Sequence, residues 1–130
     1  MNTVKDLRIL IIDPDTQFRE ELYNFLLLAG CKTIDAAKNF TEALTKIRDS
    51  SPDVVLLDAS APSMKRLEHA RHIVALNQKI KVILMIKAED QQDWNEKEKN
   101  TAEFHFMIKT DFAQYLLFLL KTTQSHSATE

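Results

Sequence analysis

The chain has 130 residues, of which 45% are hydrophobic and 28% charged, a balance typical of one globular domain with a core of its own. The 17 Lys and Arg against 19 Asp and Glu give a formal net charge of −2, which argues against a general nucleic-acid surface. The single cysteine, Cys31, excludes an intramolecular disulfide and a CxxC zinc or redox site, and suits a reducing cytoplasm. No apolar run approaches the roughly 18 residues that span a bilayer.

The first part of the chain alternates an apolar run, an amphipathic stretch and a second short run. Residues 7–12 predict a strand, broken only by Arg8. The sequence Asp13-Pro14-Asp15-Thr16 ends that strand and starts a helix, with proline near the first helical position. Residues 33–36 predict a weak second strand. The apolar stripe of the helix between them, which Gly30 closes at its C-cap, consists of Phe18, Leu22, Phe25 and Ala29.

Glycine is otherwise absent from the chain. Turns that need a positive φ must therefore fall to Asn, Asp or Ser.

The middle of the chain predicts a helix, a strand and a helix. Asn39 or Thr41 caps a second helix. The four apolar residues 54–57 read as a strand that is buried on both faces and ends at Asp58. A third helix extends from about Ser63 to Leu76. The residues expected to face inward are Phe40, Ala43, Leu44 and Ile47 in the second helix, and Leu67, Ala70 and Val74 in the third.

The last part of the chain holds two more apolar runs. Residues 82–86 predict a fourth strand ended by Lys87, and residues 104–108 a fifth strand ended by Lys109. Residues 89–103 are mostly charged or amide, which indicates a marginal, solvated helix or a mobile segment. Asp111 caps a last helix that reaches about residue 123.

These elements predict an α/β fold of (βα)5 type, with a five-stranded parallel sheet between two layers of helices. We expect one domain over residues 1–124, followed by a polar tail over residues 125–130.

Charged residues directly follow four of the five predicted strands: Asp13, Asp58, Lys87 and Lys109. A single charge of this kind can merely end a buried strand. In a parallel sheet, however, all these strand ends meet at one edge, where open α/β sheets bind their ligands. Four charges together therefore indicate a functional site.

Asp13 after Ile-Leu-Ile-Ile, Leu-Leu-Asp58-x-x-x-Pro62 and Ile108-Lys109 form an ordered set. Over nearly the whole chain, from about residue 7 to 122, this set resembles the CheY-like receiver domains of two-component response regulators. The resemblance implies a flavodoxin-like three-layer fold with strand order 2-1-3-4-5. It also implies that Asp58 accepts a phosphoryl group from a phosphohistidine and that Lys109 binds the phosphoryl oxygens. Mg²⁺ would then be held by Asp13, Asp58 and the backbone carbonyl of Ser60.

This chemistry needs these residue types. A carboxylate that attacks a phosphoryl group is an anion approaching an anion, so cations must neutralise the oxygens as the bonds change. Mg²⁺ prefers hard oxygen ligands, which carboxylates supply.

The chain departs from the family pattern at several positions. Pro14 replaces the second of two adjacent acids, and Asp15 either caps the helix or reaches a metal. Lys87 replaces the Thr or Ser whose hydroxyl follows the phosphoryl group during switching, and Phe106 stands at the switch aromatic without a hydroxyl. Lys65-Arg66 and Thr110 replace an Asp-Gly pair and a proline.

These departures leave two modes of action open. In the first, Asp58 is a phosphoacceptor with reduced affinity for Mg²⁺. In the second, Lys87 pairs with Asp58 and partly replaces the metal, which gives a pseudo-receiver that binds partners or dimerises without phosphate. Under the second hypothesis, the Lys87→Thr variant should gain measurable Mg²⁺ binding. A flavodoxin-type flavin site is disfavoured, because the acidic turn at Asp13 is unsuited to cradling a phosphate.

We expect in either mode a cytoplasmic signalling module of a phosphorelay, and not an enzyme. Its partners would be a sensor histidine kinase or another signalling protein, without nucleic acid or membrane binding.

In the last helix we expect one face to pack on the sheet, leaving three apolar residues for self-association or partner binding. The inward set is Phe112, Tyr115, Leu116 and Leu119; the remaining residues are Leu117, Phe118 and Leu120. The residues at which switching or partner contact is expected are Phe106, Tyr115 and Phe118.

Four further side chains need interpretation. His69 and His72 lie within one helical turn, and without an evident third ligand they are better read as solvated than as metal-binding. Trp94 is either an anchor for a partner or folds back on the sheet. Cys31 is expected to be a small buried side chain.

Overall fold

The computed structural model describes residues 4–59, 65–94 and 103–123, with the backbone alone at residues 65 and 66. The described elements alternate strands and helices in the predicted order, and short 3-10 turns occur at Val4–Asp6 (η1), Ala88–Asp93 (η2) and Lys109–Asp111 (η3). The strands are β1 (Arg8–Ile12), β2 (Thr33–Ala37), β3 (Val54–Asp58), β4 (Lys81–Ile86) and β5 (His105–Ile108). The helices are α1 (Thr16–Leu28), α2 (Phe40–Ser50), α3 (Lys65–Leu76) and α5 (Phe112–Lys121).

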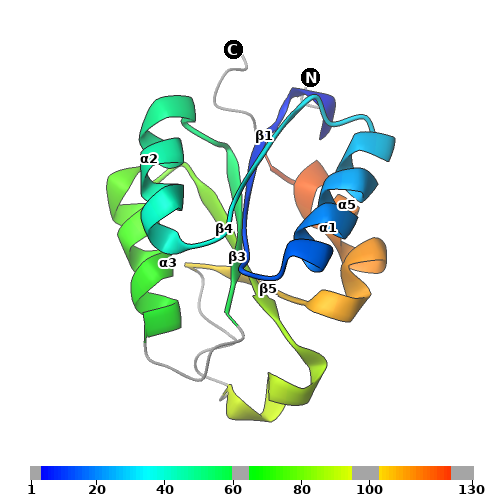
Figure 1. Ribbon diagram of the computed structural model, residues 1–130, viewed down its shortest axis with the longest axis vertical. Helices are drawn as coiled ribbons and strands as arrows, with labels where there is room; N and C mark the ends of the chain where they lie inside the picture. Colours follow the sequence, from blue (N-terminus) through cyan, green and yellow to red (C-terminus); the bar gives the residue numbers. More distant parts are fainter. Residues whose placement is uncertain (1–3, 60–64, 95–102, 124–130) are drawn as a thin grey trace.

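The five strands form one parallel sheet in the order β2-β1-β3-β4-β5, as the sequence predicts. Ile12 of β1 lies opposite Leu57 of β3, and Asp58 lies opposite Met85 of β4. The register therefore brings the carboxyl ends of the central strands to one edge. Figure 1 shows this edge at the lower side of the molecule.

Helices cover both faces of the sheet, with α2 and α3 on one side and α1 and α5 on the other (Figure 1). The strands are buried on both faces, so successive residues alternate between two hydrophobic cores. Leu10 and Leu57 belong to the core under α2 and α3, whereas Ile11 and Leu56 belong to the core under α1 and α5. This double burial explains why β1, β3 and β4 read as continuous apolar runs.

The ends of the helices follow the local sequence. The Asp15 carboxylate accepts a hydrogen bond from the backbone N–H of Phe18 at the start of α1, and Asn39 does the same for Glu42 at the start of α2. Gly30 has φ +98° just after α1. Ser51, which follows α2, has φ +48° and takes the left-handed role that the scarcity of glycine assigns to Asn, Asp or Ser.

The segment after β4 is more ordered than the sequence indicates. Residues Ala88–Asp93 form the 3-10 turn η2, and Trp94 beyond it is only 2% exposed. The Trp94 ring packs edge-on against Phe106 of β5, with centroids 5.2 Å apart. Trp94 thus folds back on the sheet, and the interpretation as an exposed anchor is wrong. The remainder of the predicted segment, residues 95–102, lies outside the described part.

The buried face of α5 also differs from the expected one. Leu116 and Leu120 are fully buried, whereas Tyr115 is 53% exposed. The prediction that Tyr115 faces the sheet and Leu120 does not is therefore wrong. Tyr115 and Leu120 border the stripe of Phe112, Leu116 and Leu119 on opposite sides, so spacing alone does not decide which of the two is buried. Phe118, at 66% exposure, lies on the surface as expected.

None of the helices described by the structure is long and apolar enough to cross a membrane.

Candidate functional site

Asp13 is the first residue beyond β1 and is fully buried. Its backbone N–H donates to the Ala37 carbonyl at 3.0 Å, so the residue continues the β1–β2 ladder. Its side chain accepts a hydrogen bond at Oδ1 from the backbone N–H of Asp15, at 2.9 Å. The turn through Pro14 thus holds the Asp13 carboxylate by one oxygen and leaves Oδ2 for the inside of the site.

Asp15 is an N-cap residue. Its carboxylate accepts from the backbone N–H of Phe18 at 3.2 Å, so the structure favours the capping role over the metal-binding role that the sequence left open.

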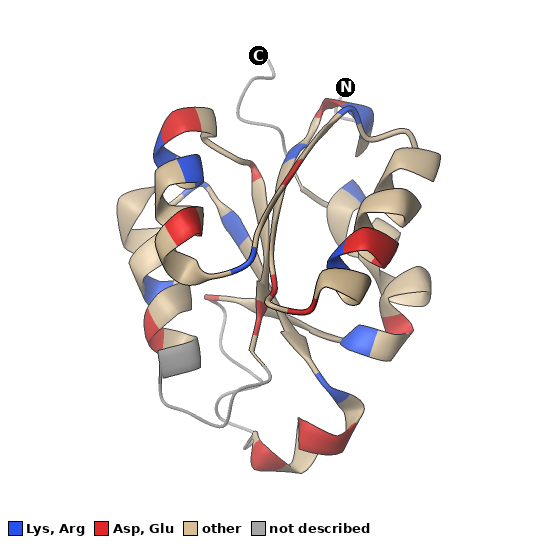
Figure 2. Ribbon diagram, in the orientation of Figure 1, with Lys and Arg blue, Asp and Glu red and all other residues tan. Residues whose placement is uncertain are grey.

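Lys109 joins the two acidic strand ends. Its Nζ lies 2.8 Å from Asp13 Oδ2 and 2.8 Å from Asp58 Oδ1. The Lys109 side chain is 9% exposed, and the Asp58 side chain, at the last position of β3, is 12% exposed. Three of the four predicted strand-end residues therefore meet, at the edge of the sheet where acidic and basic segments lie together in Figure 2.

The surroundings shift the protonation equilibria of this group. Burial raises the pKa of the Asp13 carboxyl, although its hydrogen bonds from Lys109 and Asp15 act in the opposite direction. Burial alone would lower the pKa of Lys109, but its hydrogen bonds to Asp13 and Asp58 outweigh burial and raise it. A raised lysine pKa keeps the ammonium charged at neutral pH. The site therefore has a fixed cation at its centre.

Lys87, the fourth predicted residue, does not join this group. It precedes the 3-10 turn η2 and is exposed, and among the residues that the structure describes Asp58 forms its ion pair with Lys109. The predicted Lys87–Asp58 pair is therefore absent. Lys109, which follows β5, contacts Asp58 Oδ1, whereas the Lys87 side chain at the end of β4 is exposed.

The residues at which switching, partner contact or metal binding was expected differ in their location. Phe106 is half-buried beneath Trp94, whereas Tyr115 and Phe118 are exposed on α5. Ser60, whose carbonyl the resemblance assigns to the metal, lies outside the described residues.

The two histidines of α3 contact an aromatic ring. His69 stacks on Phe40 of α2, with ring centroids 3.9 Å apart and an interplanar angle of 7°, and His72 meets the same ring edge-on at 5.5 Å. Within the described ranges there is no group of three or more His, Cys, Asp or Glu residues that could hold a metal. His69 and His72 thus contribute to the packing between α2 and α3.

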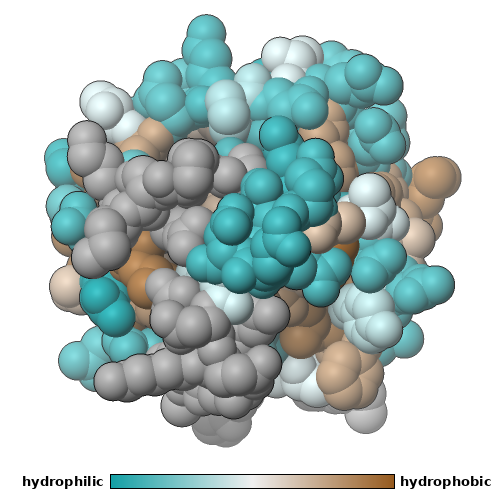
Figure 3. Space-filling view, turned by 90° about the horizontal axis from the view of Figure 1, so that it is seen from below, coloured by the Kyte–Doolittle hydropathy of each residue, from teal (hydrophilic) through white to brown (hydrophobic). Residues whose placement is uncertain are grey.

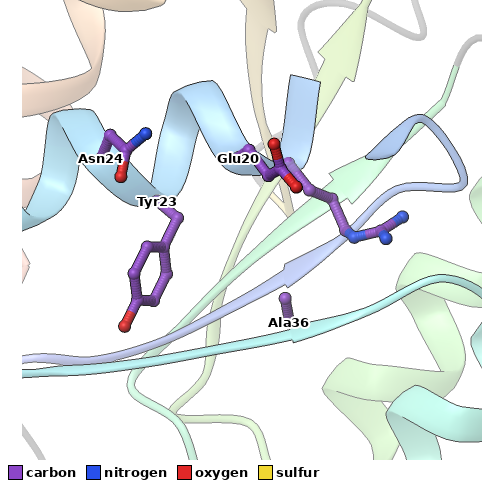
Figure 4. Close-up of a pocket in the computed structure, with 5 residues that line it drawn as sticks. Glu20, Tyr23, Asn24 and Ala36 are labelled. Atoms are coloured by element: carbon purple, nitrogen blue, oxygen red, sulfur yellow. The ribbon is translucent and has the colours of Figure 1, made fainter. Parts of the chain in front are cut away.

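A pocket of about 260 Å³ lies next to the ionic group and does not include it. Glu20, Tyr23 and Asn24 line it from α1, and Ala36 from β2 (Figure 4). Arg19 also lines it and donates from Nη1 to the backbone carbonyl of Asp13 at 2.6 Å. The pocket therefore does not contain Asp13, Asp58 or Lys109.

Sequence reasoning missed two contacts of this site, those of Arg19 and Phe18. The Phe18 ring lies under Lys109, with Nζ 4.9 Å from the ring centroid. Phe18 reads as one member of the apolar stripe of α1, and spacing alone does not distinguish a core ring from a ring beside an ammonium.

Viewed from the side where the strands end, the described surface is mostly hydrophilic at its centre, with hydrophobic surface towards its borders (Figure 3). The hydrophilic centre of this face agrees with the charged residues at the ends of the strands.

The family model of the response regulator receiver domain matches residues 9–114. The chain belongs to this family. Receiver domains are signalling modules of two-component systems, and they interact with histidine kinases and other signalling proteins. The fold and the family resemblance predicted from the sequence are thereby confirmed.

Curated relatives share part of this receiver domain. A protein-glutamate methylesterase/protein-glutamine glutaminase of Treponema denticola is 32% identical over 83 residues, which cover 63% of the chain and 22% of that protein. A chemotaxis protein CheY of Listeria monocytogenes is 34% identical over 78 residues, covering 60% of the chain and 66% of that protein. The chain spans about a fifth of the methylesterases that it matches.

Solved structures agree in fold. Chemotaxis protein CheY4 of Vibrio cholerae superposes with a TM-score of 0.69 at 20% identity, covering 91% of the chain and 98% of that protein. The receiver domain of the histidine kinase CKI1 from Arabidopsis thaliana, complexed with Mg²⁺ and BeF₃⁻, superposes with a TM-score of 0.64 at 15% identity, covering 92% of each chain. At these identities the likeness shows the fold alone.

Proposed function

We propose that this receiver domain accepts a phosphoryl group on Asp58 and passes the signal on through protein–protein contacts. The observation that carries the proposal is the position of Lys109 Nζ, 2.8 Å from a carboxylate oxygen of Asp58 and 2.8 Å from one of Asp13. A phosphoacceptor carboxylate needs a cation fixed beside it, because the incoming phosphoryl group is itself anionic.

In the proposed reaction, one carboxylate oxygen of Asp58 attacks phosphorus. The new O–P bond forms as the bond between phosphorus and the donor breaks, and that electron pair leaves with the donor, a histidine imidazole or acetate. Lys109 contributes its ammonium to the phosphoryl oxygens. It can do so without a large movement, since it already contacts Asp58 and only 9% of its side chain is exposed.

The proposed metal ligands are the carboxylates of Asp13 and Asp58 and the carbonyl of Ser60. When bound, Mg²⁺ would neutralise charge on the phosphoryl oxygens. Two converging carboxylates suit a hard cation that keeps several of its waters. Pro14 supplies no carboxylate, however, and the Lys109 ammonium already offsets one negative charge, so we infer weak binding of Mg²⁺ and an atypical receiver.

The proposed partners are a histidine kinase, as phosphoryl donor, and a second signalling protein or a second copy of this domain on α5, in the cytoplasm. Support for contact through α5 comes from the exposure of two aromatic side chains on it, Tyr115 at 53% and Phe118 at 66%. Sedimentation velocity should show concentration-dependent association that the Phe118→Glu variant loses. Leu76→Glu, at a 45% exposed leucine on α3, is the control that should keep it.

The phosphoacceptor proposal is tested by intact-mass spectrometry after incubation with acetyl phosphate and Mg²⁺. We expect the addition of one phosphoryl group, which the Asp58→Asn variant loses. The Asp35→Asn variant is a matched control, because Asp35 is also an ion-paired aspartate, bound to Lys46 at 2.9 Å on the far edge strand β2. An unmodified wild-type mass after prolonged incubation would contradict the proposal and favour a phosphate-independent pseudo-receiver.

A further inference from the structure

The Lys109 ammonium is held by an aromatic ring as well as by the two carboxylates. Nζ lies 2.8 Å from each of Asp13 and Asp58, and 4.9 Å from the centroid of the Phe18 ring. The face of a phenyl ring carries negative electrostatic potential and attracts an ammonium within about 6 Å of its centroid. Phe18 therefore supplies a third, uncharged contact, from α1, to a lysine that follows β5.

The Phe18 ring is itself fixed by further rings. It meets Phe112, the first residue of α5, edge-to-face at 5.8 Å with an interplanar angle of 83°. Phe112 in turn meets Phe25 of α1 edge-to-face at 5.2 Å, again at 83°. Such T-shaped pairs are the arrangement that the ring quadrupoles favour. The three rings thus form a small cluster between α1 and α5, with Phe18 at the end nearest Lys109.

The backbone of Phe18 is tied to the same site. Its N–H donates to the Asp15 carboxylate at 3.2 Å, and the Asp15 N–H donates to Asp13 Oδ1 at 2.9 Å. The turn that positions the Asp13 carboxylate therefore also fixes where the Phe18 side chain leaves α1. Two consecutive hydrogen bonds thus fix the position of the Phe18 backbone relative to the Asp13 carboxylate.

A lysine needs this kind of support more than most residues, because its ammonium sits on a flexible four-carbon stem. Two carboxylates on one side leave the ammonium free to follow either of them. A ring face beneath it limits that movement and keeps water from one side of the charge. The contact between the Phe18 ring and the Lys109 ammonium does not depend on the Asp58 oxygens. It can therefore remain when one of those oxygens becomes bonded to phosphorus.

We propose that Phe18 is a positioning residue: its ring face holds the Lys109 ammonium between Asp13 and Asp58, in the place where a phosphoryl group on Asp58 needs a cation. The role of Lys109 in phosphoryl transfer rests on the proposed function. The positioning of its ammonium by Phe18 does not.

The first test measures position directly, in the unphosphorylated protein. The Cε protons of Lys109 should show an upfield ring-current shift in NMR spectra, with the signal assigned by its loss in Lys109→Arg. Phe18→Leu should abolish the upfield shift and Phe18→Tyr should keep it. The matched control is Phe25→Leu, which removes a ring of the same cluster that contacts Phe112 and should leave the Lys109 signal in place. An unshifted signal in the wild type, or equal loss in Phe18→Leu and Phe25→Leu, would overturn the proposal.

The second test measures the consequence for transfer from acetyl phosphate. Phe18→Leu should lower the maximal rate by about 2- to 30-fold, the range expected for one cation–π contact, with little change in the acetyl phosphate concentration at half-maximal rate. Phe18→Tyr should retain the wild-type rate. A Phe18→Leu rate equal to that of Phe25→Leu would contradict a positioning role. If the wild type accepts no phosphoryl group, the proposed function fails alone, and the NMR result still decides whether Phe18 positions Lys109.

Discussion

Arg19 Nη1 donates a hydrogen bond of 2.6 Å to the backbone carbonyl of Asp13. The same guanidinium donates from Nη2 to Thr16 Oγ1 at 3.3 Å. A side chain in the second turn of α1 thus spans back to the turn that carries the buried acid. Together with the Asp15 N–H on Asp13 Oδ1, this bond fixes the backbone and the carboxylate of Asp13 independently.

Replacement of Arg19 by Met should loosen this turn while keeping most of the aliphatic contact of the side chain. A hydrogen bond from a charged donor contributes about 1.5–3 kcal/mol when desolvated, and because Arg19 is half-buried we expect a loss of about 1 kcal/mol in the free energy of unfolding. Urea denaturation measures it. The control is Arg48→Met, at an exposed arginine of α2. Equal stabilities of the two variants would show that the Arg19–Asp13 bond contributes nothing.

The fold was predictable because its strands are buried on both faces. Runs such as Val54–Leu57 can only be strands or short core helices, and the alternation with amphipathic stretches favours strands of a parallel sheet. The convergence of Asp13 and Asp58 followed from the same topology. Which lysine reaches them did not, because Lys87 and Lys109 both follow a strand and the sequence gives no direction for either side chain. Which of the two lysines reaches the carboxylates depends on the path that the chain takes beyond each strand.

One error and one open alternative have a similar origin. Tyr115 and Leu120 border the buried stripe of α5 on opposite sides, and only Leu120 is buried. A helical wheel drawn from the sequence shows the stripe but not the exact direction in which the sheet lies. Trp94 could not be placed because its own segment is polar, and its contact with Phe106 joins residues from different elements.

Removal of the Lys109 charge should destabilise the protein, most strongly at high pH. In Lys109→Met the carboxylate of Asp13 is left buried and unpaired, which costs about 3–5 kcal/mol when one partner of a buried ion pair is removed. Without the Lys109 hydrogen bond, the pKa of Asp13 rises further above 3.8. The folded variant therefore binds a proton that the unfolded chain has lost, and the cost of the substitution grows as pH rises through that window.

Chemical denaturation of wild type and Lys109→Met from pH 4 to pH 8 measures this difference. The double variant Asp13→Asn/Lys109→Met should recover part of the loss, because the buried carboxylate of Asp13 is no longer present. A stability difference independent of pH would show that Asp13 is not the group left uncompensated.

Trp94 should contribute strongly to the stability of the sheet edge. Its side chain is 2% exposed and packs edge-on against Phe106, so truncation to Ala should cost about 3–5 kcal/mol, as for other buried large aromatics. Trp94→Phe should cost less, since the ring contact is partly kept. Urea denaturation followed by circular dichroism measures both variants. A loss below 1 kcal/mol in Trp94→Ala would show that the contact between Trp94 and Phe106 contributes little to the stability of the sheet edge.

Metal affinity should respond to position 14 and not to position 87. Pro14→Asp adds a carboxylate beside Asp13, and since a supporting group at a metal site is commonly worth about 10–100-fold, we expect a gain of that order in Mg²⁺ affinity. Pro14→Asn, which removes the proline ring without adding charge, is the control. Lys87→Thr should leave the affinity unchanged, because Lys87 is exposed and Asp58 pairs with Lys109.

Titration with Mg²⁺ followed by NMR distinguishes these variants. A gain in Lys87→Thr equal to that in Pro14→Asp would restore the hypothesis that Lys87 takes the place of the metal.

Cys31 should make the protein less stable as pH rises above 9. Burial raises the pKa of its thiol from 9.0 to about 11, and the side chain is 3% exposed in the core under α1 and α5. Between these values the unfolded chain has lost the thiol proton while the folded chain retains it, so the free energy of unfolding falls with increasing pH, by up to about 2–3 kcal/mol. The contribution of Lys109, whose pKa is raised above 10.5, is lost only at higher pH still. Denaturation of wild type and Cys31→Ala from pH 8 to pH 10.5 should show the decline in the wild type alone, whereas parallel curves would mean that the thiolate is accommodated in the folded core.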